Sequence, residues 1–458
     1  MKSAVRKYAI LFFGCVLFHI AGTWSLPLID RDEPRFAEAS REMIERGDYI
    51  VPYFNNQLRL DKPPLAYWAQ TVSFRVFGEN DFAARFPSAI AAALTALVIF
   101  AWGMRLGGEK LGWWGAIIFT LSLQTFVHAK AAVADMWLVL FMTTAHWSGF
   151  ELLRGTATNS RKLPTPNSQR PTPNSEEANQ TSNIKHQTSL WWWFTFYVGL
   201  ALGFLGKGPV AWVPLLTVGT TIIFAPEAQL ARRFKFVYGI LLTLALVALW
   251  GIPALIQTHG EFFTVGIGRH VISRSFATME GHGANSPAMY LLLLPFYFVT
   301  VFVSFFPWSI KLPWLARTLW RERKTGIADP GYSWNLIDKY LVTGVAIIFI
   351  IFTLIKTKLP HYTLPAFPLL ALLLARHWQE ATIANSERLR ERGRRSLFKA
   401  IAVVSACISV AIALVIPPMV ARLFPAYQLF QESRASLQPN MQFASLEFEE
   451  PSLVWYFR

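Results

Sequence analysis

The sequence has few cysteines and few charged residues for its length. Only two cysteines occur in 458 residues, Cys15 and Cys407, and both fall inside apolar runs. This position favours packing over a disulfide or a metal site. Charged residues make up 16% of the chain and hydrophobic residues 53%, whereas a soluble domain carries about 25% charged residues. The composition therefore indicates an integral membrane protein.

Long apolar runs make up much of the chain. A run of roughly 20 residues crosses a bilayer, and lipid requires each backbone group to be paired within its own segment, so the spans are expected to be α-helical. The runs predict about eleven transmembrane helices, at 8–28, 87–104, 111–128, 134–153, 190–206, 209–225, 236–256, 288–310, 339–355, 362–377 and 398–418. Between the fifth and sixth, Lys207-Gly208-Pro209 indicates a broken helix or a re-entrant pair.

The basic residues predict an orientation. A net charge of +15 would suggest nucleic acid for a soluble protein, but here the cations concentrate in alternate connectors, as the positive-inside rule describes. A basic start without a small-residue cleavage site indicates a retained first span with the N-terminus inside. We therefore expect a membrane domain at 1–418, with outer loops at 29–86 and 257–287 and an outer segment at 419–458. No nucleic-acid partner is expected.

Two further features concern organisation. Residues 155–189 are rich in Pro, Ser, Thr and Asn and contain a near-repeat of PTPNS, so they are expected to form a disordered cytoplasmic loop. No repeat relates the two halves of the chain, which counts against an inverted-repeat transporter.

Most polar chemistry gathers in the loop at 29–86, which we call the first loop. Asp32 or Glu33 is expected to cap a helix that ends at Gly47 and lies on the membrane surface. An extended stretch and a turn at 55–57 follow, and then a double proline presents Lys62 at a stiff corner.

Five acidic or basic residues in or near this loop are candidates for chemistry. Asp32 either belongs to a salt-bridged interfacial helix or acts as a base towards an acceptor hydroxyl, with Arg35 near an anion. Lys62 either snorkels at the interface or holds a lipid-linked phosphate, with Asp61 as orienter or metal ligand. Asp135 lies at the mouth of a span, where a carboxylate is costly and typically functional.

Later outer connectors add further candidates. The His and Glu residues of 257–287 could bind a divalent metal, although their spacing matches no zinc template. The corner at 356–362 contains Lys358 and Tyr362, which either anchor the interface or contact the donor phosphate. Together, these corners and the carboxylates fit an anionic lipid headgroup.

The motifs DEPRFAEASREMIERGDYIVPYFN, LDKPPLAYW and ARFPSA resemble the first outer loop of the bacterial polyprenyl-phosphate-sugar glycosyltransferases. This GT-C family includes the lipid A aminoarabinose transferases and is related to the protein O-mannosyltransferases. GKGPVAW, the region 270–274 and KTKLPHYTLPAFPLLALLLA resemble the same family in the same order.

The resemblance implies a GT-C fold in the bacterial inner membrane, with the active site on the periplasmic face. A sugar would move, with inversion, from undecaprenyl phosphate to a lipid A, glycan or protein acceptor. Asp32 matches the catalytic aspartate of the D-E-x-R motif, and Arg35 and Lys62 match cationic positions around the donor phosphate. Asp135 matches the acidic residue after the third span.

Other positions match the family in part. His270, Arg274 and Tyr362 correspond to headgroup or metal positions. Asp61 stands where close relatives carry Glu, and this shorter side chain weakens the case for a metal held by Asp61 and His270. Family members also continue into a longer outer domain, so this chain is expected to be a shortened or truncated member.

Two other classes compete with the enzyme. A transporter or flippase for lipid-linked or anionic solutes should carry ionisable residues in mid-span, and here only His19 and His146 lie there. A non-catalytic scaffold protein would not explain why charged residues gather in the first loop.

Overall fold

The computed structural model describes residues 2–160, 175–224, 233–273, 286–328, 336–384, 388–438, 441, 443–445 and 448–458. The helices are α1 (Lys2–Ile20), α2 (Asp32–Arg46), α3 (Leu65–Phe77), α4 (Asp81–Gly107), α5 (Glu109–Thr120), α6 (Leu123–His128), α7 (Asp135–Ser160), α8 (Ser175–Lys207), α9 (Val213–Phe224), α11 (Phe236–Gln257), α13 (Pro287–Leu292), α14 (Phe296–Ser304), α15 (Leu312–Ala328), α16 (Leu336–Leu354), α17 (Phe367–Ala384), α18 (Arg388–Val420), α19 (Pro425–Ser433) and α20 (Pro451–Phe457). Shorter helical turns are η1 (Pro209–Trp212), η2 (Phe262–Ser273), η3 (Trp308–Lys311) and η4 (Pro360–Ala366).

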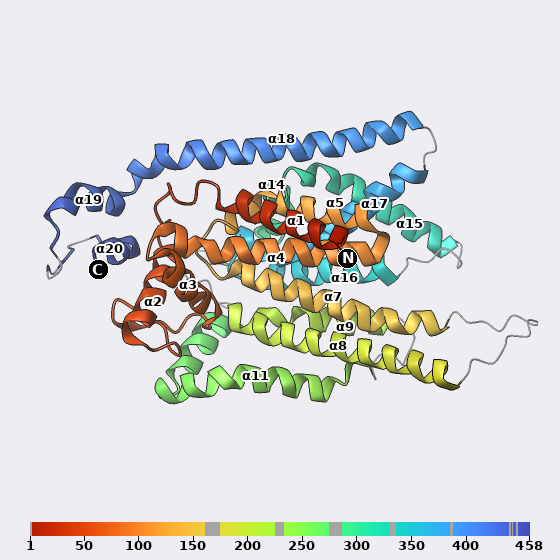
Figure 1. Ribbon diagram of the computed structural model, residues 1–458, viewed down its shortest axis with the longest axis horizontal. Helices are drawn as coiled ribbons and strands as arrows, with labels where there is room; N and C mark the ends of the chain where they lie inside the picture. Colours follow the sequence, from red (N-terminus) through yellow and green to blue (C-terminus); the bar gives the residue numbers. More distant parts are fainter. Residues whose placement is uncertain are drawn as a thin grey trace, which may run out of the picture.

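The long helices lie side by side along one axis, and α2, α3 and α20 gather at one end of the bundle (Figure 1). Among the described residues, the only sheet is a small hairpin in the first loop, β1 (Tyr53–Phe54) and β2 (Gln57–Leu58). The predicted α-helical class is therefore confirmed.

Five described helices are long and apolar enough to cross a bilayer: Asp81–Gly107, Ser189–Lys207, Phe236–Gln257, Leu336–Leu354 and Ser396–Leu423. Eleven continuous spans are not confirmed, because several of the expected runs are divided. The run at 288–310 splits into α13, α14 and η3 at Pro295 and Pro307, where proline cannot continue an α-helix. The predicted break after Lys207 is confirmed, since Gly208 (φ 80°) and Pro209 separate α8 from η1 and α9.

The first span is shorter than expected. Helix α1 ends at Ile20 rather than at Leu28, and Gly22 then takes a φ of 76°. The Lys130 ammonium donates to the carbonyls of Phe18 (3.2 Å), His19 (2.9 Å) and Ala21 (2.6 Å). A cation at this position satisfies helix carbonyls that have no partner within α1.

The first loop has the predicted order of elements. Helix α2 ends at Gly47 with a φ of 65°, and the predicted turn is the hairpin turn at Asn55 and Asn56, with φ of 52° and 62°. The cap prediction is wrong, because Arg31 occupies the cap position without a side-chain hydrogen bond and Asp32 and Glu33 lie in the first turn.

The segment at 155–189 is expected to be disordered, but helices extend into it from both ends. Helix α7 extends to Ser160 and α8 begins at Ser175. Disorder is therefore not confirmed at these two ends, and residues 161–174 lie outside the described part of the chain.

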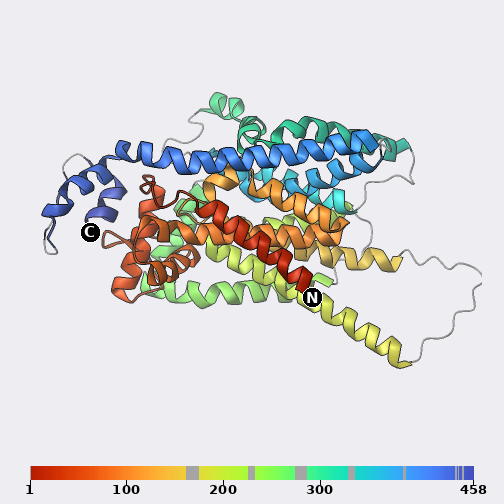
Figure 2. The same ribbon diagram turned by 45° about the horizontal axis from the view of Figure 1, so that its top comes forward.

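Helix α18 lies along the outside of the bundle (Figures 1 and 2). Only 6% of its most apolar stretch is buried. Such an exposed apolar surface is expected of a helix that faces lipid.

The C-terminal segment packs against the first loop. Trp455 of α20 stacks on Phe74 of α3, with ring centroids 5.8 Å apart, and Arg41 of α2 donates to the Trp455 carbonyl at 3.1 Å. Arg458 forms ion pairs with Glu38 and Glu42 of α2. Residues at opposite ends of the chain thus form one layer at this end of the bundle.

Candidate active site

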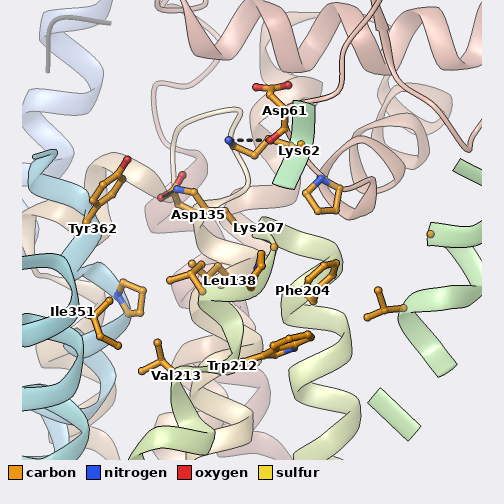
Figure 3. A pocket seen from close by; sticks show the side chains of 18 of the residues that line it. Asp61, Lys62, Asp135, Leu138, Phe204, Lys207, Trp212, Val213, Ile351 and Tyr362 are labelled. Atoms are coloured by element: carbon orange, nitrogen blue, oxygen red, sulfur yellow. Dashed lines mark hydrogen bonds and ion pairs between the residues drawn. The ribbon is translucent and has the colours of Figure 1, made fainter. Parts of the chain in front are cut away.

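A cavity of about 860 Å³ lies where the first loop meets the bundle. Its walls come from the first loop, α7, α8, η1, α9, α11, η2, α16 and η4. Figure 3 shows Asp61, Lys62, Asp135, Lys207 and Tyr362 towards one end and apolar side chains below them. The apolar part is lined by Leu138, Val139, Phe204, Val210, Trp212, Val213, Leu215, Leu216, Leu244, Val247, Ile351 and Phe352, among others. The cavity is therefore amphiphilic.

A lysine–carboxylate pair marks the polar end. The Lys207 ammonium lies 2.6 Å from Asp135 Oδ1, and both side chains are largely buried. Asp135 is the first residue of α7 and Lys207 is the last residue of α8. A carboxylate at a helix N-terminus and an ammonium at a C-terminus each complement the helix dipole. Gly208 and Pro209 stop α8 at this point and so fix the lysine in the cavity wall.

Lys62 and Asp61 contribute the first-loop side of this end. The Lys62 ammonium donates to the Asp61 carbonyl at 3.2 Å, and both residues line the cavity. Pro63 and Pro64 follow and lead directly into α3, so the backbone after Lys62 is stiff, as predicted.

Arg59 contacts this corner through Tyr67 and Asp61. Its Nε donates to the Tyr67 hydroxyl at 2.9 Å, and its Nη2 lies 3.3 Å from Asp61 Oδ2. Burial disfavours the guanidinium charge, but Tyr67, Asp61 and Asp32 together raise the pKa of Arg59 above its ordinary value. Arg59 therefore remains a fixed cation, held by Tyr67 and Asp61.

Asp32 and Glu33 are adjacent but have opposite environments. Asp32 is exposed and is not among the cavity-lining residues. Glu33 is 3% exposed and accepts hydrogen bonds from Ile29 N (2.7 Å), Ala132 N (2.6 Å) and two nitrogens of Arg85 (2.9 and 2.6 Å). Glu33 is thus a structural anchor, and Asp32 is the carboxylate presented to solvent.

Arg35 lies one turn along from this pair. Its side chain is half-buried, and within the described residues no hydrogen bond or ion pair holds Arg35 or Asp32. The structure therefore places both groups outside the cavity, on the α2 side of the first loop.

The predicted corner at 356–362 divides into two parts. Tyr362 lines the cavity. Lys358 does not; its ammonium donates to the carbonyls of Phe352 (3.0 Å), Thr353 (2.5 Å) and Ile355 (2.5 Å) at the end of α16. Lys358 therefore caps the C-terminus of α16.

The predicted metal pair, Asp61 and His270, lies only partly within the described residues. Asp61 lies at the cavity, but the side chain of His270 and all of Arg274 lie outside the described part of the chain. A different set does come together: one ligand atom from each of His128, Asp135 and His361 lies within 4.8 Å of the others. Sequence reasoning missed both histidines and the role of Lys207. The break at Gly208-Pro209 was the available signal for Lys207.

Comparison with known proteins gives related sequences. Residues 61–162 match the family model of dolichyl-phosphate-mannose-protein mannosyltransferase. Over 403 residues the chain is 29% identical to the undecaprenyl phosphate-alpha-4-amino-4-deoxy-L-arabinose arabinosyl transferase of Edwardsiella ictaluri, covering 85% of this chain and 63% of that protein. A second such transferase, from Sodalis glossinidius, is 30% identical over 370 residues, covering 78% of this chain and 58% of that protein. The chain therefore spans about three fifths of the length of these relatives.

Solved structures share the fold. The crystal structure of ArnT from Cupriavidus metallidurans bound to undecaprenyl phosphate aligns with a TM-score of 0.69 and 18% identity, over 98% of this chain and 84% of that one. The apo oligosaccharyltransferase of Archaeoglobus fulgidus aligns with a TM-score of 0.53 and 11% identity, over 96% of this chain and 62% of that one. These comparisons confirm the resemblance drawn from the motifs: the chain is similar in sequence to the undecaprenyl-phosphate aminoarabinose transferases and shares the GT-C glycosyltransferase fold.

Proposed function

We propose that this chain is a membrane glycosyltransferase that moves a sugar from a polyprenyl phosphate to an acceptor. The observation that carries the proposal is the amphiphilic cavity, in which Lys62 and Lys207 lie at one end of a long apolar chamber. An isoprenoid phosphate has the complementary shape, with one anionic head on an apolar chain. The names of the sequence relatives point to undecaprenyl phosphate as the carrier.

The cations are proposed to stabilise the leaving group. When the bond between the anomeric carbon and the phosphate oxygen breaks, negative charge grows on the phosphate. Lys62 and Tyr362 would contact that phosphate directly, and Arg35 and Arg274 are proposed to approach it from the outer loops. Ammonium groups held in place before the reaction stabilise the transition state without having to reorganise.

Asp32 is proposed to be the base. An acceptor hydroxyl would attack the anomeric carbon from the face opposite the phosphate, which inverts that centre, and its proton would pass to the Asp32 carboxylate. The exposure of Asp32 suits contact with an acceptor that arrives from outside the cavity. Asp135 is proposed to act from the cavity wall by fixing the position of Lys207, whose ammonium lies 2.6 Å away.

The proposed reaction takes place on the outer face of the bacterial inner membrane. Asp61 in the first loop, Asp135, Lys207 and His361 all line one cavity, and they come from connectors that the charge pattern assigned to the same side. We propose an N-terminus inside, a membrane domain over 1–418 with about eleven crossings, and outer loops at 29–86 and 257–287. Lipid A, another glycan or a protein remains the proposed acceptor class, and the segment 419–458 completes the outer surface.

The test compares two exposed carboxylates of the first loop. Membranes that contain Asp32→Asn or the control Glu79→Gln are supplied with radiolabelled undecaprenyl-phosphate sugar. Loss of label transfer in Asp32→Asn alone, at equal protein level, supports the proposal. Transfer that is unchanged in Asp32→Asn contradicts it, and movement of intact donor across sealed vesicles without transfer would indicate a flippase instead.

A further inference from the structure

Three side chains from separate segments meet at the polar end of the cavity. His128 ends α6, Asp135 begins α7 and His361 lies in η4. One ligand atom from each lies within 4.8 Å of the others, with His361 Nε2 3.9 Å from Asp135 Oδ1 and the two imidazole centroids 5.0 Å apart. Asp135 and His361 also line the cavity. The set thus has one side enclosed by protein and one side facing the cavity.

This ligand set has the chemistry of a divalent metal site. Zinc sites that keep an open position use three protein ligands from imidazole and carboxylate groups, with bonds of about 2.0–2.2 Å, so ligand atoms lie roughly 3.3 Å apart. The separations here are 3.9 Å between His361 Nε2 and Asp135 Oδ1 and at most 4.8 Å for the whole set, so metal binding requires the side chains to draw together by about 0.6–1.5 Å. The open position would face the cavity.

The surroundings of His128 favour ligation. Its Nδ1 lies 2.9 Å from the side-chain amide of Gln124. This contact between Gln124 Nε2 and Nδ1 holds the imidazole in place from the side of one ring nitrogen, as hydrogen bonds commonly do for ligating histidines.

The positive charge of Lys207 opposes metal binding at this site. Its ammonium contacts Asp135 Oδ1, and among the described residues no partner is recorded for Oδ2. Oδ2 can therefore serve a metal, but the neighbouring ammonium repels a dication. An anion in the cavity, close to both, would offset this repulsion. Metal and anion should then strengthen each other's binding by the same factor.

We propose that His128, Asp135 and His361 bind a divalent transition-metal ion, with zinc as the best match, and that a phosphate in the cavity increases the affinity. The proposal deepens the proposed function, since the phosphate would be that of the donor lipid. Metal binding itself does not depend on sugar transfer, so the two proposals fail separately.

The test titrates the purified full chain in detergent with zinc alone, by calorimetry, and with cobalt(II), by its visible absorption. We expect one equivalent to bind, and His128→Ala or His361→Ala to weaken binding by at least about tenfold. The exposed His259 gives a matched control, since His259→Ala should leave the affinity unchanged. Equal melting temperatures for the variants exclude loss of fold, and His361→Gln repeats the test with a side chain of similar size.

Lys207→Met separates this site from adventitious binding. Loss of the ammonium should raise zinc affinity and reduce the gain that undecaprenyl phosphate produces in the unaltered chain. Inorganic phosphate, tested in parallel, shows whether the headgroup alone suffices. Absence of stoichiometric binding, or equal affinity in the unaltered chain and in both alanine variants, would overturn the proposal. Metal binding in a chain without transferase activity would leave the site standing and contradict the proposed function.

Discussion

Glu33 and Asp32 offer the sharpest test of the site, because neighbouring carboxylates should fail in different ways. Glu33 accepts four hydrogen bonds, two of them from the buried guanidinium of Arg85. Arg85 also donates to the Thr23 carbonyl at 3.0 Å and the Pro27 carbonyl at 2.8 Å. This network joins the end of α1, the start of α2, α4 and the α6–α7 connector.

The expected loss of stability follows from the interactions that Glu33→Gln removes. The amide keeps one acceptor oxygen but directs an NH₂ group at donors, so two of the four hydrogen bonds lose their acceptor. The Arg85 charge also loses the one carboxylate that forms an ion pair with it within the described residues. Removing one member of a buried ion pair costs about 3–5 kcal/mol. Asp32→Asn changes an exposed side chain, for which about ±0.5 kcal/mol is expected, while loss of a general base lowers the rate by about 10²–10⁴-fold.

The assay measures thermal unfolding in detergent beside label transfer in membranes. Glu33→Gln should melt well below the unaltered chain and lose transfer in proportion to folded protein, whereas Asp32→Asn should melt normally and lose transfer. In the double variant Glu33→Gln/Arg85→Met, part of the lost stability should return, since neither charge is then buried alone. A Glu33→Gln protein of normal stability that is inactive would refute this division of roles and make Glu33 a reactive group.

Three further outcomes follow from contacts at the same end of the bundle. Tyr456→Phe leaves Asp81 Oδ2 without its 3.0 Å hydrogen bond and should cost about 1–3 kcal/mol of stability, measured by thermal unfolding; no loss would show that α20 is not held by this contact. Lys358→Met should lower the melting temperature by removing a helix cap worth up to about 2 kcal/mol but leave undecaprenyl phosphate affinity unchanged, and a weakened affinity would restore the lysine as a phosphate ligand. Burial raises the pKa of Glu38 to about 7, so the folded state holds that proton more tightly than the unfolded chain, and stability falls as pH rises from about 4.5 towards 7. Glu38→Gln should remove this part of the pH dependence in unfolding scans between pH 4.5 and 8, and an unchanged slope would contradict it.

Local patterns in the sequence predicted the parts of the fold that depend on local physics. Apolar runs predicted helices because each helix pairs its own backbone. Gly47 and the paired asparagines at 55–56 predicted a helix end and a turn, and both positions have positive φ in the structure. The double proline predicted the stiff corner at Lys62. Each of these signals acts within a few residues.

Contacts between distant segments were not predictable in this way. The partner of Asp135 is Lys207, 72 residues later, and nothing in either local sequence specifies the pairing. Arg458 likewise contacts α2 across 420 residues. The proposed metal ligands His128 and His361 were not predicted from the sequence, because each lies alone in its own segment, without the short ligand spacing that identifies a zinc motif.

The D-E-P-R motif combines a buried anchor with the exposed carboxylate that is proposed as the base, and the local sequence does not distinguish these two acids. Either carboxylate fits the first turn of a helix equally well, because both favour the positive end of the helix dipole. Only the tertiary position of Arg85 and of the Ala132 amide decides that Glu33 turns inward. Once Glu33 is fixed by four hydrogen bonds, the backbone of Asp32 is held in place, and only its side-chain rotamers remain free. A base must be held near its substrate proton to be effective. In the proposed mechanism, the buried Glu33 therefore positions the exposed Asp32, and the proposed role of Asp32 depends on that of Glu33.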